Sequence, residues 1–221
     1  MRQCDSHTIG TYFLFMLLLI AAGLSGCAGK GEIIDLDLQA LPIRNTEYMA
    51  PPNAPPIYVL TFEDARPVTD RLGVRTHWGG GLTYFTVWGG EMGKGMASLA
   101  VEYLQQRGWQ ATWLRDKAQA DALTKGVILS GRILSFAANA KSRFLATDID
   151  VDVKVAFSAR NVIDGSTVRM VLGSNGTETV MVFDPEDVRD LTNEVIQELF
   201  EELFQDLVIQ DGTLRLRSRQ S

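Results

Sequence analysis

The clearest pattern in the chain is a strict alternation of apolar and charged positions between residues 147 and 157. Every odd position from Ile149 to Phe157 is apolar, and every even position from Asp148 to Lys154 is charged. A period of two is typical of a β-strand that buries one face and exposes the other. The pattern therefore predicts a half-buried strand from Thr147 to Phe157.

Two other segments repeat apolar residues every three or four positions, which is the spacing of an amphipathic helix. The first runs from Met96 to Arg107 and is followed by Gly108, a common residue just beyond a helix end. The second begins after Asp184, a favourable N-cap, with Pro185 at the first helical position. The apolar stripe of this helix is broad enough to cover a sheet and comprises Val188, Leu191, Val195, Leu199, Leu203 and Leu207, widened by Ile196, Phe200 and Phe204.

Shorter runs rich in branched and aromatic residues predict further strands. Asp164-Gly165 predicts a tight hairpin, and Gly173–Gly176 predicts a second turn. We therefore expect residues 127–183 to form an antiparallel meander. The other expected strands cover 34–38, 57–62, 82–88 and 109–114, with a helical turn at 118–122.

These elements predict an α+β fold, in which two main helices pack on one face of a mostly antiparallel sheet. We expect a single domain over residues 57–210. Residues 42–56 contain five of the seven prolines, so residues 27–56 are interpreted as a Pro-rich tether, with a proline-rich recognition motif as the alternative. Residues 211–221 carry three arginines and are predicted to be a basic flexible tail, which frays or contacts anionic headgroups.

The first 26 residues have the order of a signal peptide. A weakly positive start at Arg2 precedes an apolar run from Tyr12 to Leu24. This run is shorter than the about 20 residues that a comfortable bilayer crossing needs. It leads into a tetrapeptide that resembles a lipobox, the processing site of bacterial lipoproteins, formed by Leu24, Ser25, Gly26 and Cys27.

The lipobox resemblance implies removal of residues 1–26, a thioether-linked lipid on Cys27 and fatty acylation of the new amino terminus, leaving 195 residues. The alternative is an ordinary secretory signal with an incidental cysteine. Several acyl chains hold a protein stably at a membrane, whereas one alone does not. We therefore expect a membrane partner through Cys27.

Composition excludes one class of partner. The net charge is −6 both before and after loss of residues 1–26, because Arg2 and Asp5 are removed together. Nucleic-acid binding requires clustered basic residues, so it is not expected. Cys4 and Cys27 are the two cysteines, so the mature chain has no disulfide.

The sequence predicts no enzyme. His77 is the one histidine of the mature chain, and it lies in a glycine-rich stretch without an evident orienting partner. The spacing around Gly93-Lys94 fits neither a phosphate loop nor a dinucleotide fingerprint, so neither a nucleotide nor another cofactor is expected. Asp148, Asp150 and Asp152 suggest a cation ladder, but an extended strand separates same-face carboxylates by about 7 Å, so a solvated face is preferred and no metal is expected.

Residues 73–95 combine glycines with aromatic residues, which suggests mobile connections around one strand. The aromatic side chains either pack on the sheet edge or contact a partner. Because exposed aromatics contribute strongly at interfaces, this region is the first candidate for a partner-binding loop. The candidate residues are Trp78, Tyr84, Phe85 and Trp88.

The order of elements resembles the YajG-type family of small bacterial lipoproteins, related in outline to auxiliary lipoproteins of envelope transport systems. The resemblance implies a compact domain displayed from a membrane on a tether. Because Ala28 rather than aspartate follows Cys27, it also implies the periplasmic face of the outer membrane. The resembling segments are the lipobox, 34–38 with its proline-rich sequel, 100–109, 120–123, 148–157 with Asp164-Gly165, and the last helix.

Two functions follow as hypotheses. The first is a non-enzymatic lipoprotein that binds another envelope protein as a scaffold or assembly factor. The second is a lipid-handling auxiliary subunit of an ABC-type transport system, which would need an apolar groove between the sheet and the helices. Joint exposure of the four candidate aromatics would support the first.

Overall fold

The structure is a computed structural model, and it describes residues 31–42, 49–87 and 89–217. Its helices are α2 (Met92–Gln106), α3 (Lys117–Asp121) and α4 (Pro185–Gln205). Its strands are β1 (Glu32–Leu36), β2 (Ile57–Leu60), β3 (Glu63–Asp64), β4 (Gly73–Thr76), β5 (Leu82–Val87), β6 (Ala111–Leu114), β7 (Val127–Arg143), β8 (Ala146–Asn161), β9 (Thr167–Val180), β10 (Leu207–Gln210) and β11 (Thr213–Leu216). The signal peptide and lipobox lie outside the described residues.

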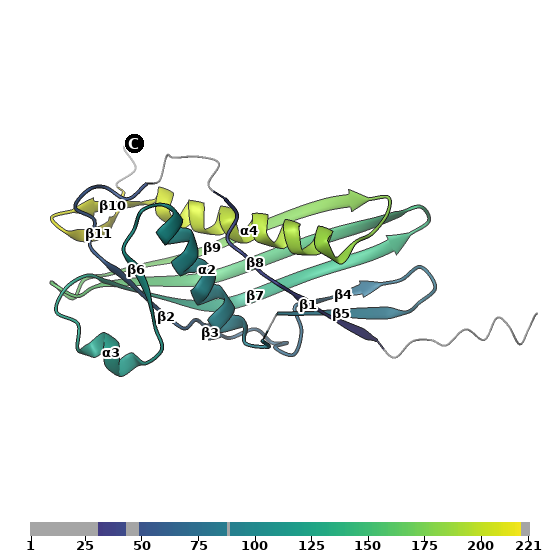
Figure 1. Cartoon of the computed structure of the whole chain (residues 1–221), viewed down its shortest axis with the longest axis horizontal. Helices are drawn as coiled ribbons and strands as arrows, with labels where there is room; N and C mark the ends of the chain where they lie inside the picture. The colour runs from purple at the N-terminus through teal and green to yellow at the C-terminus, as the bar shows by residue number, and fades with distance from the viewer. Residues whose placement is uncertain (1–30, 43–48, 88, 218–221) are drawn as a thin grey trace, which may run out of the picture. The chain divides into compact units, whose positions relative to one another are not determined.

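The long strand β7 organises the main sheet. One edge of β7 pairs with β8 along its whole length, and β8 pairs in turn with β9 (Figure 1). The other edge accommodates three short strands in succession, with β2 beside Val127–Leu129, β3 beside Arg132 and β4 beside Ala140. β5 and β1 continue the sheet beyond β4, and β6 continues it beyond β2.

The expected mostly antiparallel sheet is wrong, because the sheet is mixed. Among the described strands of the main sheet, five of the eight pairings are parallel. The antiparallel meander predicted within residues 127–183 is confirmed as β7, β8 and β9. The parallel pairings join segments that are distant in sequence, and local periodicity contains no information about such partners.

The alternation that predicted β8 is confirmed, although the strand is longer than expected. Ile149, Val151 and Val153 are buried, whereas Asp150 and Asp152 are exposed. The predicted turn at Gly173–Gly176 is wrong, because β9 runs through it without interruption. Gly176 has a packing role there: a Cβ atom would lie 2.8 to 2.9 Å from side-chain atoms of Val195 and Leu191 on α4.

Both main helices lie on one face of the sheet, as predicted (Figure 1). α4 has a reciprocal capping box at its start, where Asp184 accepts a hydrogen bond from the Glu186 N–H and Asp187 accepts one from the Asp184 N–H. α2 contacts α4 through aromatic packing of Tyr103 on Phe200. The short helix α3 contacts β6 and covers a satellite apolar cluster formed by Leu114, Ala120 and Ile128.

The predicted boundaries of the tether and tail differ from the structure. The compact unit begins at Gly31, and β1 pairs with β5 although it lies within the expected tether. Leu36 of β1 is fully buried, which fixes this strand in the core. At the other end of the chain, residues 213–216 form a strand instead of a flexible tail.

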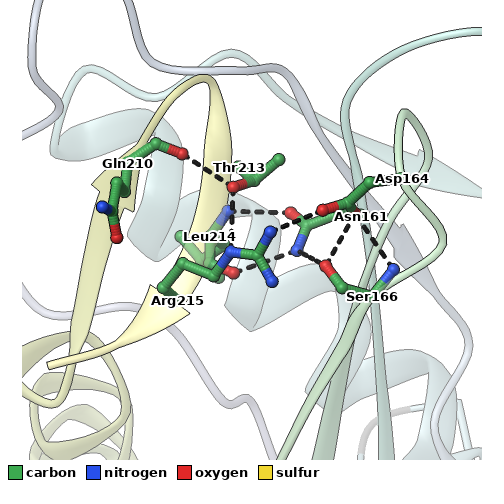
Figure 2. A network of polar contacts seen from close by, with 7 residues as sticks. All are labelled: Asn161, Asp164, Ser166, Gln210, Thr213, Leu214 and Arg215. Atoms are coloured by element: carbon green, nitrogen blue, oxygen red, sulfur yellow. Dashed lines mark hydrogen bonds and ion pairs between the residues drawn. The ribbon is translucent and has the colours of Figure 1, made fainter. Parts of the chain in front are cut away.

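Polar contacts hold the C-terminal hairpin β10–β11 against the turn between β8 and β9 (Figure 2). The buried side chain of Asn161 bonds the backbone of Leu214, and Arg215 forms an ion pair with Asp164. Hydrogen bonds from the Ser166 side chain and backbone, together with Arg215, hold the pKa of Asp164 below its usual range. The sequence predicts a basic flexible tail in this segment, whereas Arg215 has this local partner.

Candidate functional site

Three of the four predicted aromatic residues are described, and they do not form a joint exposed surface. β5 alternates in exposure, so Phe85 is completely buried while its neighbour Tyr84 is half-buried beneath the Arg71 guanidinium. Trp78 is 72 % exposed, at the turn between β4 and β5. Trp88 lies outside the described residues. Of the predicted partner-binding loop, Trp78 therefore has an exposed aromatic surface, and Phe85 belongs to the core.

Trp78 has an aromatic neighbour that the sequence analysis did not select. Its ring lies 5.5 Å from the ring of Phe144, which is in the turn between β7 and β8. Four more large apolar side chains at this end of the sheet are exposed. We call the set the apolar end; it comprises Trp78, Leu82, Phe144, Leu145, Met181 and Val182, with exposures from 40 % for Leu82 to 87 % for Val182.

Strand register explains why residues so far apart in sequence meet here. The last paired residue of β4, Thr76, lies opposite both Leu82 of β5 and Lys141 of β7. β7 ends two residues after Lys141, at Arg143, and the β7–β8 turn follows. Val180, at the end of β9, pairs with the second residue of β8. Two hairpin turns and the β9–α4 connection therefore project from the same end of the sheet (Figure 1).

The apolar end is also the end at which the described chain begins. β1 runs parallel to β5, and its first residue, Glu32, lies opposite Thr83. Since Leu82 opens β5 directly after the β4–β5 turn, β1 starts beside that turn. Gly31 is four residues after Cys27 in the sequence.

Polar and aromatic contacts brace the base of the apolar end. The Arg75 guanidinium lies 3.7 Å from the centre of the Phe183 ring, and its pKa is lowered by burial, with Glu32 opposing that shift. Arg143 pairs with Asp148 at 2.7 Å. The His77 ring nitrogen lies 2.9 Å from the Thr83 hydroxyl, so this histidine is part of the turn structure.

Four exposed residues of the apolar end were not predicted, because the local sequence indicates their exposure only weakly. They are Phe144, Leu145, Met181 and Val182. Phe144 and Leu145 occupy a two-residue turn between strands, where glycine, asparagine or aspartate is usual. Met181 and Val182 extend beyond the end of a strand and were interpreted as part of it. The exposure of Met181 and Val182 depends on the conformation of the β9–α4 connection. The local sequence does not specify that conformation.

The acidic face of β8 is a solvated strand face with local partners. Asp148 accepts a hydrogen bond from Thr179, and Asp152 accepts one from Ser135 at 3.1 Å. Within the described ranges, no group of three or more metal-ligating side chains is placed to hold an ion. No helix in the same ranges is long and apolar enough to cross a bilayer.

The structure also locates space that could receive a ligand. Between α2 and α4, the gap near Tyr103 and Phe200 has a volume of only about 10 Å³. A larger cavity of about 270 Å³ lies beside the C-terminal hairpin. Its lining includes Trp109, Phe204, Ile209 and Arg217. Where the two helices cover the sheet, the buried apolar side chains of both layers form one continuous core, so the expected groove is filled among the described residues.

One long edge of the main sheet is open. Among the described strands, β9 pairs with β8 alone, so its other edge has no strand partner over 14 residues. Exposed edges of soluble proteins are commonly protected by charged residues, proline or bulges. β9 contains no proline, and its charged residues are Arg169 and Glu178. This edge can accept an added strand.

Comparison with known proteins gives partial likenesses of fold. No protein-family model matches the chain, and no curated protein matches its sequence. One solved structure that it resembles is XCC0632 from Xanthomonas campestris, a DUF330 protein, with 11 % identity over 77 % of this chain and 92 % of that one and a TM-score of 0.46. The PelC dodecamer from Paraburkholderia phytofirmans has 15 % identity over 68 % of this chain and 88 % of that one, with a TM-score of 0.40. A minor lipoprotein from Acinetobacter baumannii has 11 % identity over 68 % of this chain and 90 % of that one, with a TM-score of 0.36. At these identities and TM-scores, the likenesses assign neither a family nor a function to this chain. The YajG-type resemblance stays a prediction.

Proposed function

We propose that this protein is a lipid-anchored, non-enzymatic envelope lipoprotein that binds another envelope protein as a scaffold or assembly factor. The observation that carries the proposal is that one continuous sheet joins the anchored end of the chain to an open edge strand. β1 follows the anchor, and hydrogen-bonded strands connect β1 through β5, β4, β7 and β8 to β9. A partner bound along β9 would be held at a fixed position relative to the membrane.

The short distance between anchor and domain supports this view. Gly31 is the fourth residue after Cys27, and an extended chain spans at most about 3.6 Å per residue, or about 14 Å. The sequence alone predicts roughly 30 residues of tether, from 27 to 56. The incorporation of β1 into the sheet removes most of that reach, so the protein is suited to a partner close to the membrane.

The edge strand supports binding of a protein. Strand addition supplies main-chain hydrogen bonds for affinity, and alternate side chains supply specificity. The outward positions of β9 include Arg169, Asn175 and Thr177, which are exposed and polar. Such a surface matches an extended segment of a partner protein better than a bilayer.

The location proposed is the periplasmic face of the outer membrane, since Ala28 follows Cys27. Metabolic labelling with a radioactive fatty acid tests the anchor. The full chain should incorporate label, and Cys27→Ala should incorporate none. Unchanged labelling of Cys27→Ala would refute the anchor, and co-fractionation with inner-membrane markers would refute the location.

Photocrosslinking in cells tests the partner. A photoreactive amino acid at Asn175 on β9 should form a discrete adduct with an envelope protein, identified by mass spectrometry. The matched control is the same group at Ser98, an exposed position on α2. Equal adducts from both positions, or none from Asn175, would contradict binding along β9.

The second hypothesis, a lipid-handling transport subunit, has less support. Its required groove between sheet and helices is filled by the apolar core. The cavity beside the C-terminal hairpin exposes polar as well as apolar surface, and its volume of about 270 Å³ lies below the about 300–1,000 Å³ that is typical of small-molecule sites. Co-purification of a stoichiometric lipid would favour this second function.

A further inference from the structure

We infer that the apolar end inserts into the interface of the bilayer that carries the lipid anchor, giving the protein a second membrane contact that fixes the orientation of its domain. The inference rests on the proposed anchoring at Cys27 and adds a site to it. The occupant is a phospholipid surface. The site consists of the exposed side chains Trp78, Phe144, Leu145, Met181 and Val182.

Geometry supplies the first argument. The described chain begins at the apolar end, because Glu32 of β1 pairs with Thr83 beside the β4–β5 turn. An anchor that reaches about 14 Å at most holds this end of the sheet near the bilayer. The opposite end, marked by the β8–β9 turn, lies about 50 Å away along β8, at roughly 3.3 Å per residue. Because the connection between Cys27 and the sheet is so short, the apolar end is the part of the domain that contacts the bilayer.

Chemistry supplies the second argument. The three projecting segments, residues 77–82, 143–146 and 181–183, contain no acidic residue, although the chain has a net charge of −6. Arg143 is their one formal charge at neutral pH. Tryptophan prefers the interface between water and lipid, and large apolar side chains gain free energy when they leave water there. Carboxylates lie directly behind these segments, with Asp148 paired to Arg143 and the exposed Asp184 at the start of α4, so the tips themselves present no negative charge to a lipid surface.

Backbone strain supplies the third argument. Leu145 has φ +65°, in the left-handed region that glycine and asparagine occupy with less strain. Its side chain is 74 % exposed, so packing within the domain does not compensate for that conformation. A large apolar residue is both conformationally strained and exposed to solvent at such a position. Contact with lipid gives it a function.

Several apolar contacts together strengthen an anchor. The acyl chains proposed on Cys27 already attach the protein stably, because several chains together hold where one binds only marginally. The apolar end would act as an additional signal, and it would also restrict rotation of the domain about the short connection. The open edge of β9 would then face the same direction relative to the membrane in every copy.

A site-specific probe tests the inference. The chain from residue 27 with Cys27→Ser contains no other cysteine, so a single introduced cysteine can be labelled with the polarity-sensitive dye NBD. Val182→Cys places the dye at the apolar end, and Ile163→Cys, 63 % exposed in the β8–β9 turn, is the matched control. An amino-terminal histidine tag attaches each protein to vesicles of phosphatidylethanolamine and phosphatidylglycerol (3:1) that contain a nickel-chelating lipid.

We expect the dye at position 182 to shift its emission to the blue and to be quenched at least about threefold by doxyl-labelled lipid, while the dye at 163 stays aqueous. An aqueous signal from position 182 on bound protein would overturn the inference and would favour a protein surface as the occupant. Because the histidine tag replaces the native lipid, this result is independent of whether Cys27 is acylated. Failure of anchoring and failure of insertion are thus separate outcomes.

Two variants separate insertion from folding. In the untagged chain from residue 27 with Cys27→Ser, Phe144→Ser combined with Val182→Ser should lower partitioning into the same vesicles at least about tenfold. Leu145→Asn should also lower partitioning, yet it should raise the urea midpoint, because asparagine tolerates positive φ. A fall in partitioning without loss of stability identifies a membrane contact. Unchanged partitioning of both variants would overturn the inference.

Discussion

Asn161 at the end of β8 and Leu214 in β11 exchange two hydrogen bonds at the end of the sheet that lies opposite the apolar end (Figure 2). The Asn161 side-chain nitrogen donates to the Leu214 carbonyl at 2.9 Å, and the Leu214 N–H donates to the Asn161 side-chain oxygen at 2.7 Å. Both residues are buried. One amide side chain thus takes the place of a strand partner and ties the C-terminal hairpin to the meander.

Asn161→Ala should destabilise the domain by about 2–4 kcal/mol, because it leaves a buried N–H and a buried C=O of Leu214 without these partners. Urea unfolding measures the loss, and hydrogen exchange should show faster exchange in β11. The control is Asn175→Ala at an exposed position of β9, which should change the free energy of unfolding by less than about 0.5 kcal/mol. Equal effects of the two substitutions would contradict this role of Asn161.

This contact illustrates what the sequence could not predict. Alternation predicted β8 and helical spacing predicted α4, since both patterns are local. Asn161 and Leu214 are 53 positions apart, and nothing near either residue identifies the other. The parallel pairs of β2, β3 and β4 with β7 were missed for the same reason, and the arginines near the C-terminus favoured a tail over a hairpin.

Asp64 and Arg66 form a two-point ion pair whose effect on stability depends on pH. The Arg66 side chain is 3 % exposed and donates to both Asp64 oxygens, at 2.8 and 2.7 Å. Hydrogen bonding from Arg66, opposed by burial, lowers the pKa of Asp64. Because the folded-state pKa lies below the unfolded value near 3.9, the stabilising effect is present above about pH 4 and is lost as the pH falls through the lowered pKa.

Asp64→Asn should therefore cost about 1–2 kcal/mol at pH 7, allowing for the partial exposure of Asp64. The difference from wild type should shrink when unfolding is measured at pH 3. Asp70→Asn removes the exposed pair with Arg71 and should cost less than about 0.5 kcal/mol at either pH. A cost for Asp64→Asn that is the same at pH 7 and pH 3 would rule out the proposed linkage.

Gly73 holds β4 against β7 through the absence of a side chain. A Cβ atom at this position would lie 1.8 Å from the Ala138 carbonyl oxygen. Gly73→Ala should destabilise the protein by about 3 kcal/mol or more, because backbone rather than a flexible side chain must move. A Cβ atom added at Gly79, in the adjacent turn, would have no neighbouring atom within 4 Å. The unfolding free energy of Gly79→Ala should therefore stay within about 0.5 kcal/mol of wild type.

The two glycines show why the candidate site was only partly predictable. The glycine-rich stretch from 73 to 95 was interpreted as mobile connections around one strand, but it contains β4, β5 and the start of α2. At Gly73 and Gly93 the backbone of another segment approaches so closely that a side chain would not fit. The glycines in turns are the ones that fit the interpretation as connections. Trp78, a candidate for partner binding, is exposed, and its binding of a partner stays a prediction. Phe144 became its neighbour through a strand pairing that composition does not encode.

Leu145 should be a position where stability and function conflict. Leu145→Asn should raise the free energy of unfolding by about 0.5–1 kcal/mol, since it relieves a positive φ and gives up little packing from a side chain that is 74 % exposed. Phe144→Asn, at the neighbouring exposed position without positive φ, should give no such gain. Urea unfolding of the soluble chain measures both. A loss of stability in Leu145→Asn would mean that the leucine packs within the domain, which would remove the strain argument for its contact with lipid.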